Sequence, residues 1–353
     1  MLSIKSREVS EIDTDGYFSL LEDLEVRRSI KSKVLKLNNQ IVDKSVNIET
    51  ILESYQDISF YKKTEDFILS SGTGNILKER KIGINERSKS SGGYFTGFNN
   101  LDTSMPTCFY PGAISVIAAR PSMGKSLFKN NLQTNICSAG GGVVSFCLEQ
   151  DFQIEMDRLT ALITGTNLKD IIQVWKWEDN DDKIEKVLDV ANLIETKWNM
   201  HFINKRTMTM MEAINIVSML KQRSQIDVVF FDLFDRLSDI NDPVNKAERI
   251  GQKLPLLLEW ARILKVHFCL VVQISRAADI RKDHRPQMSD LKSAGAYEEM
   301  TDLIMLLYNE KKYNPEAFDV PFEVIVAKQK QGEVFTGLFD LQPEMMKMYE
   351  IAQ

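Results

Sequence analysis

The chain has 353 residues, of which 43% are apolar and 27% charged, and its formal net charge is −6. This composition is typical of an ordinary soluble globular protein with one large and one smaller domain, and it gives no general attraction to nucleic acid, although a ring or cleft can concentrate positive charge. The four cysteines lie far apart without a CxxC pair, which argues against a disulfide framework or zinc knuckle and fits a reducing cytoplasm, and no segment has the pattern of a signal peptide or membrane span.

Residues 1–84 differ in pattern from the rest of the chain. Between Glu11 and Asn38 apolar residues recur at roughly helical spacing, so we expect a small, mostly helical region. Basic residues gather in the same stretch: Arg27, Arg28, Lys31, Lys33 and Lys36. Such a run is usually a solvated helix face, and a nucleic-acid patch is the alternative. Residues 85–93 are polar and rich in serine and glycine, which predicts a flexible linker to a second domain over residues 94–353.

From Tyr94 onward strands and helices alternate. Apolar runs predict strands at Ala113–Ile117, Val143–Leu148, His201–Ile203, Val228–Asp232, Phe268–Gln273, Leu303–Tyr308, Glu323–Lys328 and Val334–Asp340. Helical spacing predicts helices at Leu127–Ser138, Ile154–Ile163, Ile184–Trp198, Met210–Lys221 and Asn245–Leu264. This alternation predicts an α/β domain with a mainly parallel, twisted sheet, whose last strands form an antiparallel hairpin edge because no long helices separate them. Ligands of such sheets bind at the carboxyl ends of the strands.

A phosphate-binding loop lies between the first of these strands and the first of these helices. A strand, a tight loop with Gly-Lys-Ser and a helix form the context in which backbone N–H groups point at the β- and γ-phosphates of a nucleotide. The residues expected to bind it are Ala119, Arg120, Pro121, Ser122, Met123, Gly124, Lys125 and Ser126. Lys125 would supply a mobile positive charge, and the Ser126 hydroxyl would ligate Mg²⁺. The alternative is a chance Gly-Lys-Ser, because Ala119 stands where the first glycine of the pattern is usual.

Carboxylates follow two of the predicted strands. Asp232 ends an apolar strand, where a carboxylate is costly unless a charge partner offsets it, and Mg²⁺ reached through water would be such a partner. A capping role after the strand is its alternative, and Asp235 is a less favoured substitute. Glu149 follows the strand Val143–Leu148, which we expect next to the first strand, and would there orient the water that attacks the nucleotide.

The strand Phe268–Gln273 also ends in a polar group. The Gln273 amide can hydrogen-bond to the γ-phosphate and to a mobile loop, so its contacts would differ between triphosphate and diphosphate, as a sensor requires. The following segment, from Arg276 to Ser293, holds many arginines and lysines without an apolar period. It predicts a mobile basic loop that contacts phosphodiesters, with a surface loop of incidental charge as the alternative.

These residues together resemble the ATPase domain of DnaB-type replicative DNA helicases, the hexameric branch of RecA-like folds. The resemblance runs from about Tyr94 to the C-terminus. Its markers occur in the family's order: Phe95–Asp102, Ala118–Ser126, Phe146–Glu149, Asp232, Gln273, Pro286–Glu298 and Ala327–Gly332. The family's own loop carries alanine in place of the first glycine. The resemblance implies a RecA-like P-loop NTPase core that hydrolyses ATP with Mg²⁺, with Lys125, Glu149 and Gln273 among the catalytic residues.

Other site residues follow from the resemblance alone. Lys328 and Lys330 would act as catalytic residues on the nucleotide of a neighbouring subunit, and Lys330 stands where the family usually has an arginine finger. Because lysine lacks the bidentate fork of arginine, either both lysines act together or hydrolysis is weak or differently triggered. Lys292, where arginine is common, and Gly295 lie in the segment similar to the family's DNA-binding loop. Together with Arg276 they form the expected DNA contact.

The resemblance implies a ring-forming, ATP-dependent helicase that translocates 5′ to 3′ on single-stranded DNA as a homo-oligomer, expected to be a hexamer. A primase or a helicase loader would be its protein partners, and the cytoplasm of a bacterial or phage-infected cell its location, with no membrane involved. The region before residue 94 is shorter than the family's helical N-terminal domain. Two alternatives stay open: a RecA-like recombinase that forms filaments on single-stranded DNA, and an ATP-regulated assembly factor without motor activity.

Overall fold

The computed structural model describes residues 31–32, 35–40, 43, 47, 50, 93–105, 108–173, 182–238, 246–317 and 320–351. By its internal contacts the chain divides into two units, Met1–Asn85 and Glu86–Gln353. In the first unit the stretches 31–32 and 35–40 are helical, and Leu37 is buried. Most of the predicted helical region over 1–84, and the predicted linker over 85–93 except Gly93, lie outside the described residues, so these boundaries stay predictions.

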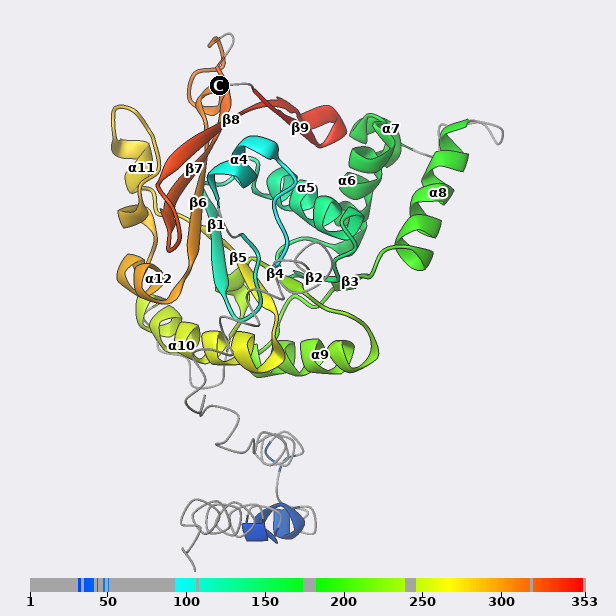
Figure 1. Ribbon diagram of the computed structural model, residues 1–353, viewed down its shortest axis with the longest axis vertical. Coiled ribbons are helices and arrows are strands. Elements are labelled where there is room, and N and C mark those ends of the chain that lie inside the picture. The colour runs from blue at the N-terminus through cyan, green and yellow to red at the C-terminus, as the bar shows by residue number, and fades with distance from the viewer. Residues whose placement is uncertain are drawn as a thin grey trace, which may run out of the picture. The chain divides into compact units, whose positions relative to one another are not determined.

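One sheet forms the centre of the second unit. Its strands are β1 (Ile114–Ala119), β2 (Val143–Cys147), β3 (Met200–Ile203), β4 (Val228–Asp232), β5 (His267–Gln273), β6 (Leu303–Asn309), β7 (Phe322–Gln329), β8 (Phe335–Gln342) and β9 (Lys347–Glu350). They lie in the order β3-β2-β4-β5-β1-β6-β7-β8-β9. The strands from β3 to β6 in this order are parallel, and β7, β8 and β9 continue the sheet in antiparallel pairs (Figure 1). The predicted antiparallel edge is confirmed, and β9 has no counterpart among the predicted strands.

Helices connect most of these strands. They are α4 (Asn99–Ser104), α5 (Lys125–Ser138), α6 (Phe152–Thr164), α7 (Leu168–Ile172), α8 (Asp182–Thr196), α9 (Met210–Arg223), α10 (Lys246–Leu264), α11 (Ala277–Ile280) and α12 (Ala294–Met300). The five helices predicted after Tyr94 are confirmed, with ends that differ by at most two residues, whereas the short helices α4, α7, α11 and α12 have no predicted counterpart. Within the described part of the chain, no helix is both long and apolar enough to cross a lipid bilayer.

Helices cover the central strands. In β1 every residue is buried. On one face α5 contributes Phe128 and Leu132 to a core that also includes Ile117 of β1. Because successive side chains of a strand point to opposite faces, the neighbouring Val116 faces the other way. α10 contacts β5 and contributes no residue to the core that α5 and Ile117 share. A sheet buried on both faces explains why the central strands are continuous apolar runs in the sequence.

The sheet order corrects one expectation about the site. The strand before Glu149 was expected beside the first strand, but β4 and β5 separate β2 from β1. The crossover through α5 therefore spans the two positions that β4 and β5 later fill. Because β1, β2, β4 and β5 are parallel, the residues after each of them still meet at one edge of the sheet. This common edge positions the site.

Two glycines give a matched test of the packing. A Cβ at Gly142, just before β2, would lie 1.8 Å from the Gln225 carbonyl oxygen, whereas a Cβ at Gly251 inside α10 would meet no heavy atom within 4 Å. We predict that Gly142→Ala lowers the free energy of unfolding by about 1–3 kcal/mol or more. Gly251→Ala should raise it by about 0.5–1 kcal/mol, because alanine favours the helix. Urea unfolding followed by circular dichroism measures both, and equal effects of the two substitutions would contradict the packing.

Candidate active site

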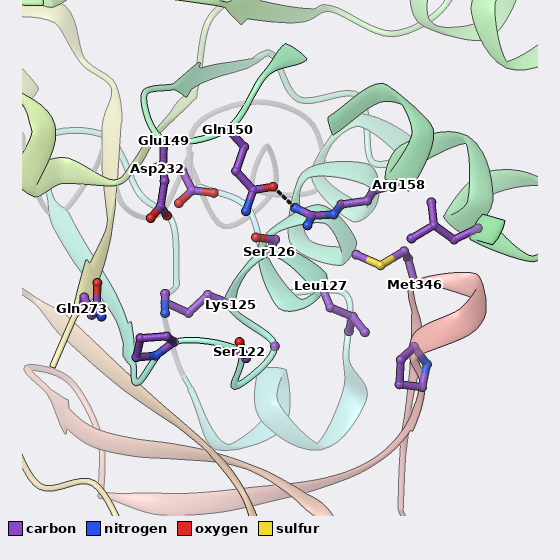
Figure 2. A pocket seen from close by; sticks show the side chains of 14 residues that line it. Ser122, Lys125, Ser126, Leu127, Glu149, Gln150, Arg158, Asp232, Gln273 and Met346 are labelled. Atoms are coloured by element: carbon purple, nitrogen blue, oxygen red, sulfur yellow. Dashed lines mark hydrogen bonds between the residues drawn. The ribbon is translucent and has the colours of Figure 1, made fainter. Parts of the chain in front are cut away.

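A pocket of about 510 Å³ opens at the carboxyl edge of the parallel strands (Figure 2). Predicted residues from four segments line it: Lys125, Ser126, Glu149, Asp232 and Gln273. Lys125 and Ser126 begin α5, Glu149 follows β2, and Asp232 and Gln273 end β4 and β5. Figure 2 shows Lys125 on the same side of the pocket as Glu149, Asp232 and Gln273. The fold thus gathers a cation, a hydroxyl, two carboxylates and an amide around one cavity.

The loop before α5 has the geometry of an anion site. Gly124 has φ 90° and ψ 13°, a left-handed conformation that suits glycine, and a Cβ there would lie 3.2 Å from the Phe322 ring. Ser122 is left-handed as well, with φ 61°. The first N–H groups of a helix have no intrahelical partners, and no side chain caps this end of α5. The helix therefore offers free donors and the positive end of its dipole at the pocket.

Three residues of the predicted nucleotide loop do not line the pocket. Ala119 is the buried last residue of β1, and the Met123 side chain is 2% exposed. The Arg120 side chain instead forms an ion pair with Asp279 of α11, with 2.7 Å between Nη2 and Oδ2, and its Nη1 donates to the Ile274 carbonyl at 3.2 Å. These residues shape the loop, and their side chains are not among the groups that face a ligand.

Arg120 connects the loop to the segment after β5. Asp279 accepts from Arg120 Nε at 3.0 Å and from the Tyr313 hydroxyl at 2.7 Å. The hydrogen bonds from Arg120 and then from Tyr313 hold the pKa of Asp279 below its usual value. The phosphate loop and α11 are therefore joined by a charge-assisted contact, which no pattern in the sequence revealed.

The Lys125 side chain folds back onto the loop that precedes it. Its Nζ donates to the carbonyl oxygens of Ala119 at 3.3 Å and Arg120 at 3.0 Å. Burial lowers the pKa of Lys125, and the nearby carboxylates of Asp232 and Glu149 act in the opposite direction. Lys125 is thus a partly desolvated cation at the helix end that faces the pocket, where it can interact strongly with an anionic ligand.

The lining of the pocket also contains residues that the sequence analysis missed: Gln150, Arg158, Leu168, Pro343 and Met346. Arg158 Nη1 donates to Gln150 Oε1 (Figure 2). In sequence Arg158 looks like a solvated residue of α6. No local pattern in the sequence marks it as a pocket residue.

Asp232 has a second cationic neighbour, Lys129 of α5, which is 1% exposed. Lys129 Nζ lies 2.8 Å from Asp232 Oδ2 and 2.6 Å from Glu155 Oε1. Burial by itself lowers the pKa of Lys129, but the charges of Asp232 and Glu155 outweigh it, so the net shift is upward. The carboxylate predicted to support Mg²⁺ is thereby compensated from inside the protein.

Lys328 and Lys330 do not reach this pocket. Lys328 Nζ donates to the carbonyl oxygens of Glu298 and Thr301, and Lys330 Nζ pairs with Asp302 Oδ1 at 2.9 Å. Lys328 thus contacts α12 and the segment between α12 and β6, and Lys330 contacts the same segment. Lys330 is 45% exposed in this ion pair.

The predicted basic loop is partly ordered and partly neutralised. It contains α11 and a 3₁₀ turn at Met288–Asp290, so it is not irregular throughout. Arg281 pairs with the buried Asp290, and Arg285 pairs with Glu323, because these carboxylates need counter-ions. The predicted DNA contacts are open to solvent: Arg276, Lys292 and Gly295 are all exposed.

The oxygen donors of the pocket suit a hard divalent cation. Ser126 and Asp232 line the cavity that the helix end faces. Among the described residues, no group of three or more His, Cys, Asp or Glu could hold a metal ion by itself. This fits Mg²⁺, which usually binds through one or two protein oxygens together with water and substrate phosphates.

Comparisons with known proteins identify the family of the second unit. The family of the DnaB-like helicase C-terminal domain matches residues 93–350. The replicative DNA helicase DnaB of Buchnera aphidicola is 25% identical over 330 residues, which cover 89% of this chain and 70% of that protein. A probable plasmid replicative DNA helicase of Chlamydia psittaci is 27% identical over 262 residues, which cover 70% of this chain and 56% of that protein.

A solved structure supports the fold. A DnaB-like replicative helicase, described together with its interactions with primase, superimposes with a TM-score of 0.77 at 22% identity. The match covers 98% of this chain and 80% of that one. The predicted α/β, RecA-like core with its mainly parallel sheet is therefore confirmed.

The buried Lys129 predicts a large effect on stability. Lys129→Met would leave Asp232 and Glu155 buried without their shared counter-ion, so we predict a loss of about 3–5 kcal/mol in the free energy of unfolding. The matched control is Lys205→Met, which removes the exposed 2.8 Å pair with Glu212 and should cost less than about 1 kcal/mol. Urea unfolding measures both, and a loss no larger for Lys129→Met than for Lys205→Met would contradict the burial of this charge.

Proposed function

The chain belongs to the family of the DnaB-like helicase C-terminal domain, and from this premise we propose that it is an ATP-dependent replicative DNA helicase, a motor that moves along single-stranded DNA and unwinds duplex at a replication fork. The observation that carries the proposal is the meeting of Lys125, Ser126, Glu149, Asp232 and Gln273 around one pocket. The helicase names of the relatives favour this function over a filament-forming recombinase or an assembly factor without motor activity.

Within the pocket, the end of α5 would bind the phosphates of ATP. The free N–H donors of its first turn and the Lys125 ammonium would surround the β- and γ-phosphates. Mg²⁺, held by Ser126 and through water by Asp232, would offset the negative charge of the phosphates. Glu149 would orient the attacking water and accept its proton, since it lies on the side of the pocket where Asp232 and Lys125 gather.

Gln273 would report the state of the nucleotide. It ends β5 inside the pocket, and the exposed Arg276 follows it by three residues. A hydrogen bond to the γ-phosphate is available only in the triphosphate state, so hydrolysis changes the contacts of this segment. The contact between Arg120 and Asp279 joins the phosphate loop to the same segment. Both routes support transmission of the change to DNA contacts at Arg276, Lys292 and Gly295.

Lys328 and Lys330 would complete the nucleotide site of a neighbouring subunit in a homo-oligomer, for which a hexameric ring is the expected form. Lys330 would have to exchange Asp302 for a phosphate, which its 45% exposure permits. As a point charge, Lys330 would interact with the phosphate without the bidentate geometry of arginine.

Several partners belong to this proposal. Single-stranded DNA would be bound mainly through its backbone, and movement from 5′ to 3′ along it is part of the proposal. A primase is a candidate partner because the solved relative's title describes interactions with primase, and a helicase loader is another. The expected setting is the cytoplasm of a bacterial or phage-infected cell.

Steady-state ATP hydrolysis with and without single-stranded DNA tests the proposal. We predict that DNA accelerates hydrolysis, and that the acceleration declines steeply with salt because phosphate contacts release counter-ions. Lys125→Ala should lower the rate by at least about 100-fold. Glu149→Gln should keep nucleotide binding and lose about 10²–10⁴-fold in turnover, because the amide cannot accept a proton. Hydrolysis that DNA leaves unchanged, or that Lys125→Ala retains, would contradict the proposed motor site.

A further inference from the structure

Lys129 is a buried charge in the middle of a helix that packs on the sheet. Its neighbours along α5, Phe128 and Leu132, are fully buried apolar residues. A lysine at such a position is costly unless its ammonium is paired and hydrogen-bonded. Here two carboxylates satisfy it: Asp232 from the end of β4 and Glu155 from α6. Three elements around the pocket thus meet at one ammonium.

The pairing is asymmetric with respect to the pocket. Asp232 lines the cavity and its side chain is 13% exposed, whereas the Glu155 side chain is 3% exposed and is not among the lining residues. Lys129 Nζ contacts Asp232 through Oδ2 alone, at 2.8 Å. Within the described part of the chain, Oδ1 of Asp232 takes part in no hydrogen bond. One oxygen of this carboxylate is therefore fixed by Lys129 and the other is left for the pocket.

A second contact holds Glu155 in this arrangement. With its side-chain amide oriented so that all groups are satisfied, Asn130 donates to Glu155 Oε1 at 2.7 Å and to the Ser126 carbonyl oxygen at 3.1 Å. Ser126 is the residue whose hydroxyl is proposed to ligate Mg²⁺. The buried cluster of Lys129, Glu155 and Asn130 thus contacts both residues of the proposed metal site, Asp232 through its carboxylate and Ser126 through its backbone carbonyl.

We propose that Lys129 is a positioning residue for Asp232. Lys129 fixes one carboxylate oxygen of Asp232 so that the other faces the pocket, and its ammonium sets the local charge that a bound Mg²⁺ experiences. This inference rests on the proposed nucleotide site. Glu155 acts in the opposite sense, since its negative charge offsets part of the ammonium. The balance between Lys129 and Glu155 determines how strongly Asp232 attracts a cation.

The two charges predict opposite effects on Mg²⁺. Glu155→Gln leaves the full positive charge of Lys129 beside Asp232, so the Mg²⁺ concentration that half-saturates nucleotide binding should rise. The double variant Lys129→Met/Glu155→Gln removes the ammonium as well, so this concentration should fall about tenfold below that of Glu155→Gln. In the double variant Glu155 is neutralised together with Lys129, so Asp232 at the pocket is the one carboxylate of the cluster left without this counter-ion. The double variant should therefore recover most of the stability that Lys129→Met loses.

The experiment is a Mg²⁺ titration of the binding of a fluorescent, non-hydrolysable ATP analogue to the full chain, for the wild type and these variants. Thermal unfolding of each variant reports stability separately, and analogue binding in the presence of a chelator reports the phosphate loop alone. The expected half-saturating Mg²⁺ concentration is higher for Glu155→Gln than for the wild type, and lower for the double variant than for Glu155→Gln. Binding of the analogue without Mg²⁺ should be unchanged.

The opposite results separate the inference from the proposed function. A stable double variant whose half-saturating Mg²⁺ concentration equals that of Glu155→Gln would show that Lys129 serves folding alone, and would overturn the inference. If the wild type nevertheless binds the analogue in a Mg²⁺-dependent manner, the proposed nucleotide site remains supported. A wild type that binds no nucleotide would contradict the proposed site, and the inference with it.

Discussion

Negative charge at the carboxyl edge of a buried parallel sheet is the constraint on which this site depends. Asp232 ends a strand on which helices pack and its side chain is only 13% exposed, so its carboxylate needs nearby cations, whereas Glu149 is exposed to solvent. Lys129 supplies one from inside α5 and Lys125 another from its first turn. A metal ion with nucleotide phosphates would complete the balance. The cations that balance Asp232 therefore stabilise the end of β4, and one of them, Lys125, would also bind the substrate.

Specific contacts connect the proposed nucleotide pocket to distant segments. Arg120 of the phosphate loop pairs with Asp279, so this loop and α11 are in direct contact. Lys330 holds Asp302, the residue immediately before β6, which is a neighbour of β1 in the sheet. The groups proposed to act on DNA and on a neighbouring nucleotide thus lie on segments that are anchored close to the central strands, where small changes at the pocket can reach them.

Much of this arrangement could be predicted because it depends on local patterns. Continuous apolar runs marked the central strands, and polar residues at their carboxyl ends, such as Asp232 and Gln273, marked the edge where the pocket lies. Helices as short as α7 and α11 gave no periodic signal, and the order of strands depends on crossovers that local patterns do not specify. Lys129 was missed because a lysine within a helix normally indicates a solvated face, and only its partners in the fold reveal that it is buried.

Strand separation on a forked DNA duplex tests the central claim most directly, because it requires nucleotide binding, hydrolysis and movement along DNA in one assay. The wild type, supplied with ATP and Mg²⁺, should release the displaced strand from a fork with a single-stranded 5′ tail, and Glu149→Gln should release none under the same conditions. Hydrolysis of ATP that DNA stimulates without any strand release, or equal release by Glu149→Gln, would contradict the account of this chain as a helicase driven by the pocket at the carboxyl edge of its sheet.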